Sequence, residues 1–106
     1  MKDIDIPKIE INSSDDDLAR YARSIAWPIR VSILRILSEH ENSISLDIFV
    51  SNSEFRWAIS RHLTELRKLG LLNQELINRK AYYSINKEAF EKMGLDFKML
   101  FLKPQS

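Results

Sequence analysis

Cysteine is absent from the 106 residues, and the chain has only two glycines and three prolines. Without cysteine there is no disulfide, no thiolate zinc site and no thiol redox sensor. Two isolated glycines, Gly70 and Gly94, do not form a glycine-rich phosphate-binding loop. No apolar run approaches the roughly 20 residues of a membrane span, and the first residues lack the apolar segment of a secretory signal. We therefore expect a cytoplasmic protein without membrane association, stabilised by ordinary hydrophobic packing.

Groups of residues that would suggest catalysis are also missing. The histidines are His40 and His62, and no serine or aspartate accompanies either at a spacing typical of a nucleophile with its base. We therefore predict that the protein is not an enzyme and needs no cofactor.

Charge is distributed unevenly along the chain, although the net charge is only +1. Residues 1–19 hold two lysines against six acidic residues, a net charge of −4, whereas residues 20–80 hold ten arginines and lysines against six acidic residues, a net charge of +4. A chain of this length forms one compact domain. We expect an acidic, loosely ordered arm or short edge strand over residues 1–16 and a mildly basic domain over residues 17–106.

Three helices are predicted in the first half of the domain. Apolar residues recur at helical spacing from about Asp17 to Ile25, where the preceding acidic residues are typical of a helix start. Pro28 suits the first turn of a second helix, which runs to about Glu39 and has Ile33 near the centre of the core. Residues 44–51 form a short third helix.

A fourth helix, a hairpin and a fifth helix follow. Ser51 or Ser53 is expected to cap the fourth helix, Ser51 with Glu54 as a capping box, and Gly70 ends it. Two alternating, β-favouring runs, 71–77 and 81–85, are joined by Asn78, Arg79 and Lys80 and read as a hairpin. Asn86 caps the last helix. The fold class is therefore mainly α with a small β-hairpin, in the order α-α-α-α-β-β-α.

The fourth helix has two contrasting faces. Its apolar face consists of Phe55, Ala58, Ile59, His62, Leu63, Leu66 and Leu69. A histidine on such a face is expected to be half-buried and hydrogen-bonded rather than a ligand. The opposite face consists almost entirely of hydrogen-bond donors, namely Arg56, Trp57, Ser60, Arg61, Thr64, Arg67 and Lys68.

A short helix, a turn, a longer helix and a two-stranded wing make up a winged helix-turn-helix, and the donor face suits the major groove of double-stranded DNA. Arg can pair with guanine, and Ser and Thr can bond base edges or phosphates. A solvated face is the alternative, but Glu65 is the only acidic residue in the helix after Glu54, which favours DNA contact. Arg79 and Lys80 are expected to contact a neighbouring minor groove or its phosphates. The sequence leaves three roles possible for Trp57: packing on the turn, stacking on DNA, or binding a partner protein.

Three stretches also resemble the ArsR-type winged-helix transcriptional repressors: LARYARSIAWPIRVSILRIL, AISRHLTELRKLGLL and AYYSI. The resemblance covers roughly residues 17–101. It implies a small homodimer that binds a palindromic operator and uses its first and last helices as the dimer interface. A large apolar stripe on the last helix independently favours a dimer seam. The predicted interface residues are Leu18, Tyr21, Ala22, Ile25, Phe90, Met93, Phe97, Leu100 and Phe101.

The sequence departs from these repressors where many of them bind metal. Cysteine is missing from the first helix of the DNA-binding motif, and the last helix has no histidine and no matching set of carboxylates. We therefore predict no metal site. The expected function is therefore a sequence-specific DNA-binding transcriptional regulator, a repressor, that acts as a homodimer on an inverted-repeat operator. An effector ligand or protein is left unidentified. The alternative is a winged-helix protein-interaction module that does not bind DNA, which the near-neutral charge and Trp57 keep open.

Overall fold

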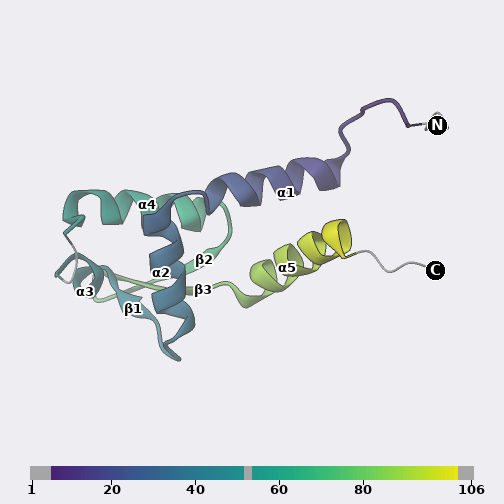
Figure 1. The fold of residues 1–106 in the computed structure, drawn as a ribbon. Helices are drawn as coiled ribbons and strands as arrows, with labels where there is room; N and C mark the ends of the chain where they lie inside the picture. Colours follow the sequence, from purple (N-terminus) through teal and green to yellow (C-terminus); the bar gives the residue numbers. More distant parts are fainter. Residues whose placement is uncertain (1–5, 52–53, 103–106) are drawn as a thin grey trace.

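The computed structural model describes residues 6–51 and 54–102. The chain is mainly helical with a small antiparallel sheet, and the predicted order of helices and wing strands is confirmed, with one short strand added (Figure 1). The elements are α1 (Ser13–Ser24), α2 (Pro28–Ser38), β1 (Ile44–Ser45), α3 (Leu46–Ser51), α4 (Arg56–Lys68), β2 (Leu72–Ile77), β3 (Lys80–Ile85) and α5 (Lys87–Phe101).

Helix α1 begins at Ser13, earlier than the expected start at Asp17. The reason is a capping box: the Asn12 side chain accepts a hydrogen bond from the Asp15 backbone N–H at 2.9 Å, and the Asp15 carboxylate accepts one from the Asn12 N–H at 3.0 Å. Asp15 and Asp16 lie in the first turn, where acidic residues stabilise the positive end of the helix dipole. The ordered domain therefore includes part of the segment that the sequence assigned to the arm.

The predicted cap of α4 at Ser51 is wrong. Ser51 belongs to α3, where its hydroxyl donates to the Ile48 carbonyl at 3.2 Å, and Ser53 lies outside the described residues. Phe55 is the N-cap residue instead, and its carbonyl accepts the first helical hydrogen bonds from Ala58 and Ile59. Ser and Thr can bond backwards to a carbonyl within a helix as readily as they cap one, so the sequence pattern did not distinguish the two.

Gly70 ends α4 as predicted. Its φ of +81° lies in the left-handed region that favours glycine, and the Leu71 N–H donates back to the Leu66 carbonyl in a Schellman arrangement. Asn86, the cap of α5, also holds this corner: its side chain donates to the Gly70 carbonyl at 2.9 Å and its backbone N–H donates to the Leu71 carbonyl at 3.0 Å. One residue therefore joins the end of α4 to the start of α5.

The wing is a hairpin with a two-residue turn. Asn78 and Arg79 have φ of +51° and +69°, the geometry of a type I′ turn, and Lys80 pairs with Ile77 inside the ladder. The expected three-residue link is therefore shorter, and Lys80 belongs to β3. Strand β1 pairs with the other edge of β3, giving the sheet order β1-β3-β2. Residues 44 and 45, predicted as helix, form this strand because β3 supplies hydrogen-bond partners that no local pattern reveals.

The core lies between α2, α3, α4 and the sheet. Leu63, Leu66 and Leu71 are completely buried, with Ile33 of α2 and Phe49 of α3 packed in the same cluster. Helices α1 and α5 pack against each other and extend away from this body (Figure 1). Within the described ranges, no helix is both long enough and apolar enough to span a membrane.

Candidate nucleic-acid interface

The donor face of α4, defined as residues 56, 57, 60, 61, 64, 67 and 68, is not covered by the rest of the chain. Every one of these side chains is exposed except Thr64, which is partly buried, and Trp57 is 83% exposed. The opposite face is buried through Ile59, His62, Leu63 and Leu66. The helix therefore packs its apolar side against the core and exposes its hydrogen-bond donors to solvent.

Cations on the donor face are not neutralised by neighbouring acids. Among residues 6–51 and 54–102, the ion pairs within 4.0 Å involve Arg20, Lys80 and Lys92, and none involves a cation of α4. Arg67 and Lys68 lie in the last turn, where they also stabilise the negative end of the helix dipole. Among the residues that the structure describes, the side chains of the donor face also make no hydrogen bond, so their donors are available to a ligand.

The wing presents its two cations differently. Arg79 is exposed at the tip of the hairpin, whereas the Lys80 ammonium lies 3.8 Å from the Asp47 carboxylate of α3. Both partners of this pair are largely exposed, so the pair is weak and easily exchanged for another anion. Arg79 is therefore the more available cation of the wing.

His62 connects α4 to the start of α2. Its Nδ1 accepts a hydrogen bond from Arg30 Nε at 3.0 Å, and Arg30 also donates to the Ser24 carbonyl at 3.1 Å. Burial, followed by the charges of Arg30 and Arg61, lowers the pKa of His62 below its ordinary value of 6.5. The neutral ring is therefore favoured, with its proton on Nε2. His62 is a buried, hydrogen-bonded histidine, as its position on the apolar face indicated.

Two residues beside α4 escaped the sequence reasoning. Trp27 and Arg30 share a surface hollow with Trp57, Arg61 and Glu65 of α4. The Arg30 guanidinium lies over the Trp27 ring at 5.5 Å, and the Trp27 and His62 rings are 5.4 Å apart. Trp27 and Arg30 belong to the stretch LARYARSIAWPIRVSILRIL that carries the family resemblance, but only the packing of α2 on α4 brings them next to the donor face.

Residues predicted for a dimer interface fall into three groups. Leu18, Tyr21 and Met93 are buried within the single chain, where α1 packs on α5. Ile25, Phe90 and Phe97 are partly buried against the core. Ala22, Leu100 and Phe101 are exposed.

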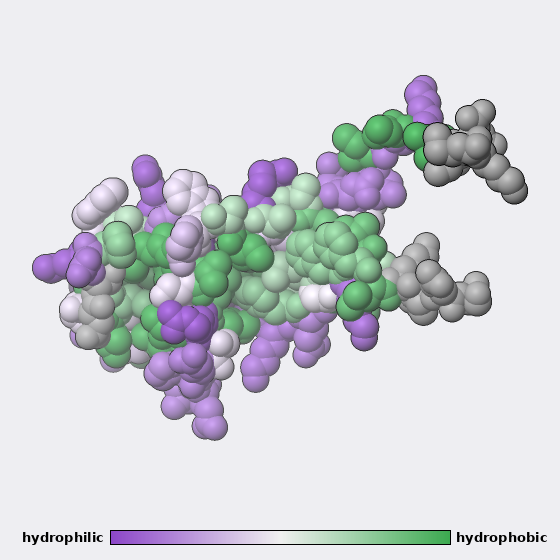
Figure 2. All heavy atoms as spheres, viewed as in Figure 1, coloured by the Kyte–Doolittle hydropathy of each residue, from purple (hydrophilic) through white to green (hydrophobic). Residues whose placement is uncertain are grey.

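More apolar side chains are exposed near the end of α5 than the sequence reasoning named. Leu95, Met99 and Leu102 join Leu100 and Phe101 there, and we call these five residues the apolar end of α5. Figure 2 shows hydrophobic side chains gathered at this end of the molecule, away from α4. The Phe97 and Phe101 rings are stacked with centroids 6.3 Å apart, so the partly buried and exposed groups are continuous.

A metal site is not apparent in the part of the chain that the structure describes: no three histidine, aspartate or glutamate residues there lie close enough together to hold an ion. The charged and aromatic groups beside α4 suit an anionic or planar ligand better than a cation.

Comparison with solved structures identifies the architecture. The chain is similar to an ArsR-like transcriptional regulator from Rhodococcus sp. RHA1, with a TM-score of 0.70 and 20% identity over 83% of this chain and 82% of that one. It is also similar to HlyU from Vibrio cholerae, with a TM-score of 0.66 and 23% identity over 88% of this chain and 100% of that one. No protein-family model matches the sequence, and neither does any curated protein. At these identities the similarity concerns the fold.

Proposed function

Since the chain has the winged helix-turn-helix fold of ArsR-type regulators, we propose that it is a sequence-specific DNA-binding transcriptional regulator, a repressor, that acts as a homodimer on an inverted-repeat operator. In this proposal α4 is the recognition helix, the hairpin is the wing, and α1 and α5 form the dimer contact.

The uncovered donor face of α4 carries the proposal. A helix about 10–12 Å across fits a major groove about 12 Å wide, and a helix can enter only with a face that the rest of the protein leaves free. In this proposal Arg61, at the middle of the exposed face, pairs with guanine O6 and N7, while Arg67 and Lys68 at the helix end contact phosphates. The absence of ion pairs on these cations, within residues 6–51 and 54–102, supports a polyanionic partner.

Trp27 and Arg30 extend the proposed interface beyond the residues that the sequence indicated. They lie at the start of α2, beside the N-terminal half of α4, and Arg30 is held by its bonds to His62 and the Ser24 carbonyl. An arginine fixed in this way loses little side-chain entropy when it binds a phosphate. We therefore expect Arg30 to contact the phosphate backbone of the DNA, and Trp27 to lie at the edge of the protein–DNA interface.

Dimerisation follows from the apolar end of α5. Phe101 is 71% exposed, and the four other apolar side chains at this end of α5 are exposed as well, which is a surface that water solvates poorly. Pairing two such ends by a twofold axis would hide both, and binding to an inverted repeat would then require the two recognition helices to lie about 34 Å apart, one turn of DNA.

Selection of bound fragments from a random DNA pool, followed by gel shifts with the selected and scrambled sequences, tests the proposal. We expect an imperfect inverted repeat and a steep salt dependence: if each subunit neutralises about four phosphates, the slope of log affinity against log salt is on the order of −7 for the dimer. A chain that binds selected and scrambled DNA equally, or neither, is not a sequence-specific regulator.

A protein-interaction module is the second candidate, and the 83% exposure of Trp57 favours it. An exposed tryptophan is a common centre of a protein interface. Trp57→Ala distinguishes the two candidates, because a DNA-binding chain keeps most of its salt-dependent affinity for DNA after this change.

A further inference from the structure

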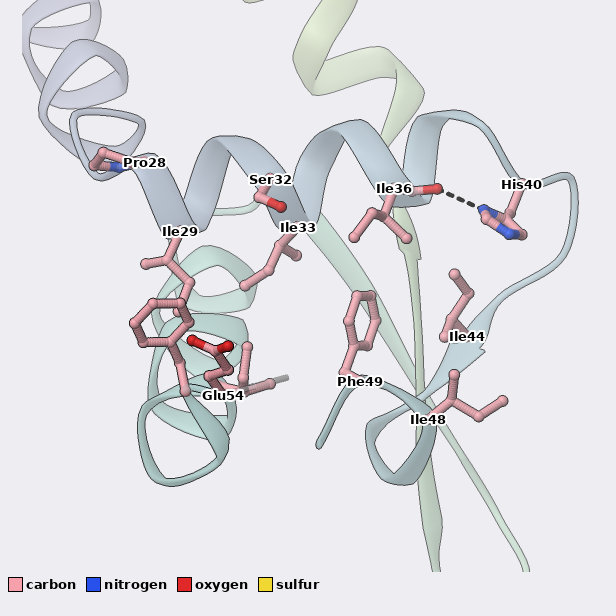
Figure 3. A pocket seen from close by; sticks show the side chains of 12 residues that line it. Pro28, Ile29, Ser32, Ile33, Ile36, His40, Ile44, Ile48, Phe49 and Glu54 are labelled. Atoms are coloured by element: carbon pink, nitrogen blue, oxygen red, sulfur yellow. Dashed lines mark hydrogen bonds between the residues drawn. The ribbon is translucent and has the colours of Figure 1, made fainter. Parts of the chain in front are cut away.

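A pocket of about 520 Å³ opens between α2, α3 and the start of α4, on the other side of α2 from the proposed dimer contact (Figure 3). Its walls are mostly isoleucine and phenylalanine, among them Ile29 and Ile36 of α2, Ile48 and Phe49 of α3, and Ile59 of α4. This volume is within the range of about 300–1,000 Å³ that holds small organic ligands. The donor face of α4 and the apolar end of α5 do not contribute to it.

The pocket has a polar group at each end. Figure 3 shows the Glu54 side chain near one end and the His40 ring at the other, with Ile33, Ile36 and Phe49 between them. His40 Nδ1 lies 2.7 Å from the Ile36 carbonyl oxygen, so this nitrogen carries the proton and, in the neutral ring, Nε2 is an acceptor. Both ends of the pocket therefore accept hydrogen bonds, and one of them is negatively charged.

Glu54 has no cationic partner of its own in the described part of the chain, where the ion pairs involve other acidic residues. Glu54 is exposed to solvent, so water screens part of its charge, but beside an apolar pocket it still attracts a cation more than a neutral group. The same carboxylate repels an anion. The charge of the pocket therefore selects for a cationic group at the end formed by Glu54.

We propose that this pocket binds a small organic amine with an apolar body, its ammonium group against Glu54 and its body among the isoleucines of α2 and α3. The apolar walls favour burial of a hydrocarbon or aromatic body, and Glu54 is the one carboxylate among the described lining residues that can orient a charged group. A neutral molecule of the same shape fills the same walls but loses the charged hydrogen bond.

Occupancy of the pocket bears on α4, and this step rests on the proposed function. Phe55, the N-cap residue of α4, and Ile59 of its first turns line the pocket, while Ile29 and Ile33 line it from α2. A ligand that prefers one spacing of α2 and α4 shifts the recognition helix relative to the rest of the domain. By linkage, the amine and DNA then change each other's affinity by the same factor.

Isothermal titration calorimetry of the full chain with three molecules of matched shape tests the site: 4-phenylbutylamine, 4-phenylbutanol and 4-phenylbutanoate. We expect the amine to bind severalfold more tightly than the alcohol, and the carboxylate more weakly than either, because Glu54 is an exposed carboxylate. Glu54→Gln should reduce amine affinity to that of the alcohol and leave the alcohol unchanged. Glu39→Gln, at the end of α2 outside the pocket, is the matched control and should change neither. Equal affinities for the three molecules, or an unaltered preference in Glu54→Gln, overturns the proposal.

Filling the pocket provides a second test. Ser32→Phe places a phenyl ring at the α2 wall, and a variant that melts cooperatively but no longer binds the amine or the alcohol supports the site. Unchanged binding by this folded variant contradicts it, and if the variant does not fold, Glu54→Gln alone decides.

Fluorescence anisotropy of a selected DNA fragment, with and without the amine, tests the regulatory step. A severalfold change in DNA affinity that Glu54→Gln abolishes supports it, and unaltered DNA affinity at saturating amine removes it. Calorimetry needs no DNA, so the ligand site is decided even if the chain does not bind DNA.

Discussion

Two surfaces at opposite ends of the molecule are exposed for different reasons. The donor face of α4 consists of groups that water solvates well, and its cations are not paired within the described ranges. The apolar end of α5 consists of leucine, methionine and phenylalanine, which water does not solvate well. The first surface is stable alone and gains from a polyanion, whereas the second is incomplete until another apolar surface covers it. Substitutions in the donor face should therefore change DNA binding without changing the oligomeric state, whereas substitutions at the apolar end of α5 should change the oligomeric state.

The largest effect is expected at the apolar end of α5. Phe101→Asp places a charge where two chains are proposed to meet, so sedimentation should give a monomer and affinity for an inverted repeat should fall roughly 100-fold, as the two half-sites lose their linkage. Phe97→Asp should also give monomers, but Phe97 is partly buried against the core, so this change should lower the melting temperature as well.

Lys98→Asp is the control for this experiment, because it introduces the same residue at an exposed polar position of α5. A Phe101→Asp chain that sediments like the parent and binds the repeat equally well would show that the apolar end serves some other purpose.

Arg61→Ala tests the opposite end. If Arg61 reads a guanine, the variant should lose about 1–3 kcal/mol of binding free energy per half-site on the selected operator and little on scrambled DNA. Arg35 is an exposed arginine of α2 outside the donor face, so Arg35→Ala should leave the affinity for operator and for scrambled DNA unchanged. An equal loss on operator and scrambled DNA would instead make Arg61 a phosphate contact, and sedimentation of Arg61→Ala should match the parent in either case.

Acid should weaken the hydrogen bond between Arg30 of α2 and His62 of α4. The pKa of His62 is lowered in the folded chain, so below about pH 6.5 the unfolded chain binds the proton more readily than the folded one. The free energy of unfolding should therefore fall as the pH drops from 7 through the lowered pKa. Denaturant titrations across this range should give a flatter profile for His62→Gln than for the parent. Identical profiles for the two chains would exclude His62 as the cause.

The smallest effect is expected in the wing. Arg79 has a positive φ, which costs a residue other than glycine about 1 kcal/mol, so Arg79→Gly should stabilise the fold by about that amount while lowering the salt slope of DNA binding by about 1. Asn78→Gly is the control, because it relieves the positive φ of the neighbouring position without removing a charge. Arg79→Gly with the parent salt slope would place the wing tip away from DNA.

Much of the proposed interface was predictable from local pattern. The 3.6-residue period assigned Arg61 and its neighbours to one face of α4 and Leu63 and Leu66 to the other, because side-chain direction on a helix depends only on position along it. Gly70 and Asn86 marked the ends of elements through conformational and capping preferences that are equally local.

Contacts between distant segments were not predictable in this way. Trp27 and Arg30 lie beside α4, residues 44 and 45 pair with β3, and Leu18 is buried within its own chain, all through packing that joins elements far apart in sequence. The pocket beside Glu54 also exists only where three helices fail to fill the space between them.

The sequence on its own therefore determined which side chains of each helix point toward water and where most helices end. Propensity, periodicity and capping act within a few residues, so they can be recognised without the fold. The folded arrangement decided which exposed groups share a surface, which apolar groups a single chain can hide, and where a cavity is left. These depend on the shapes of elements meeting across the domain, and no short stretch of sequence encodes such a shape.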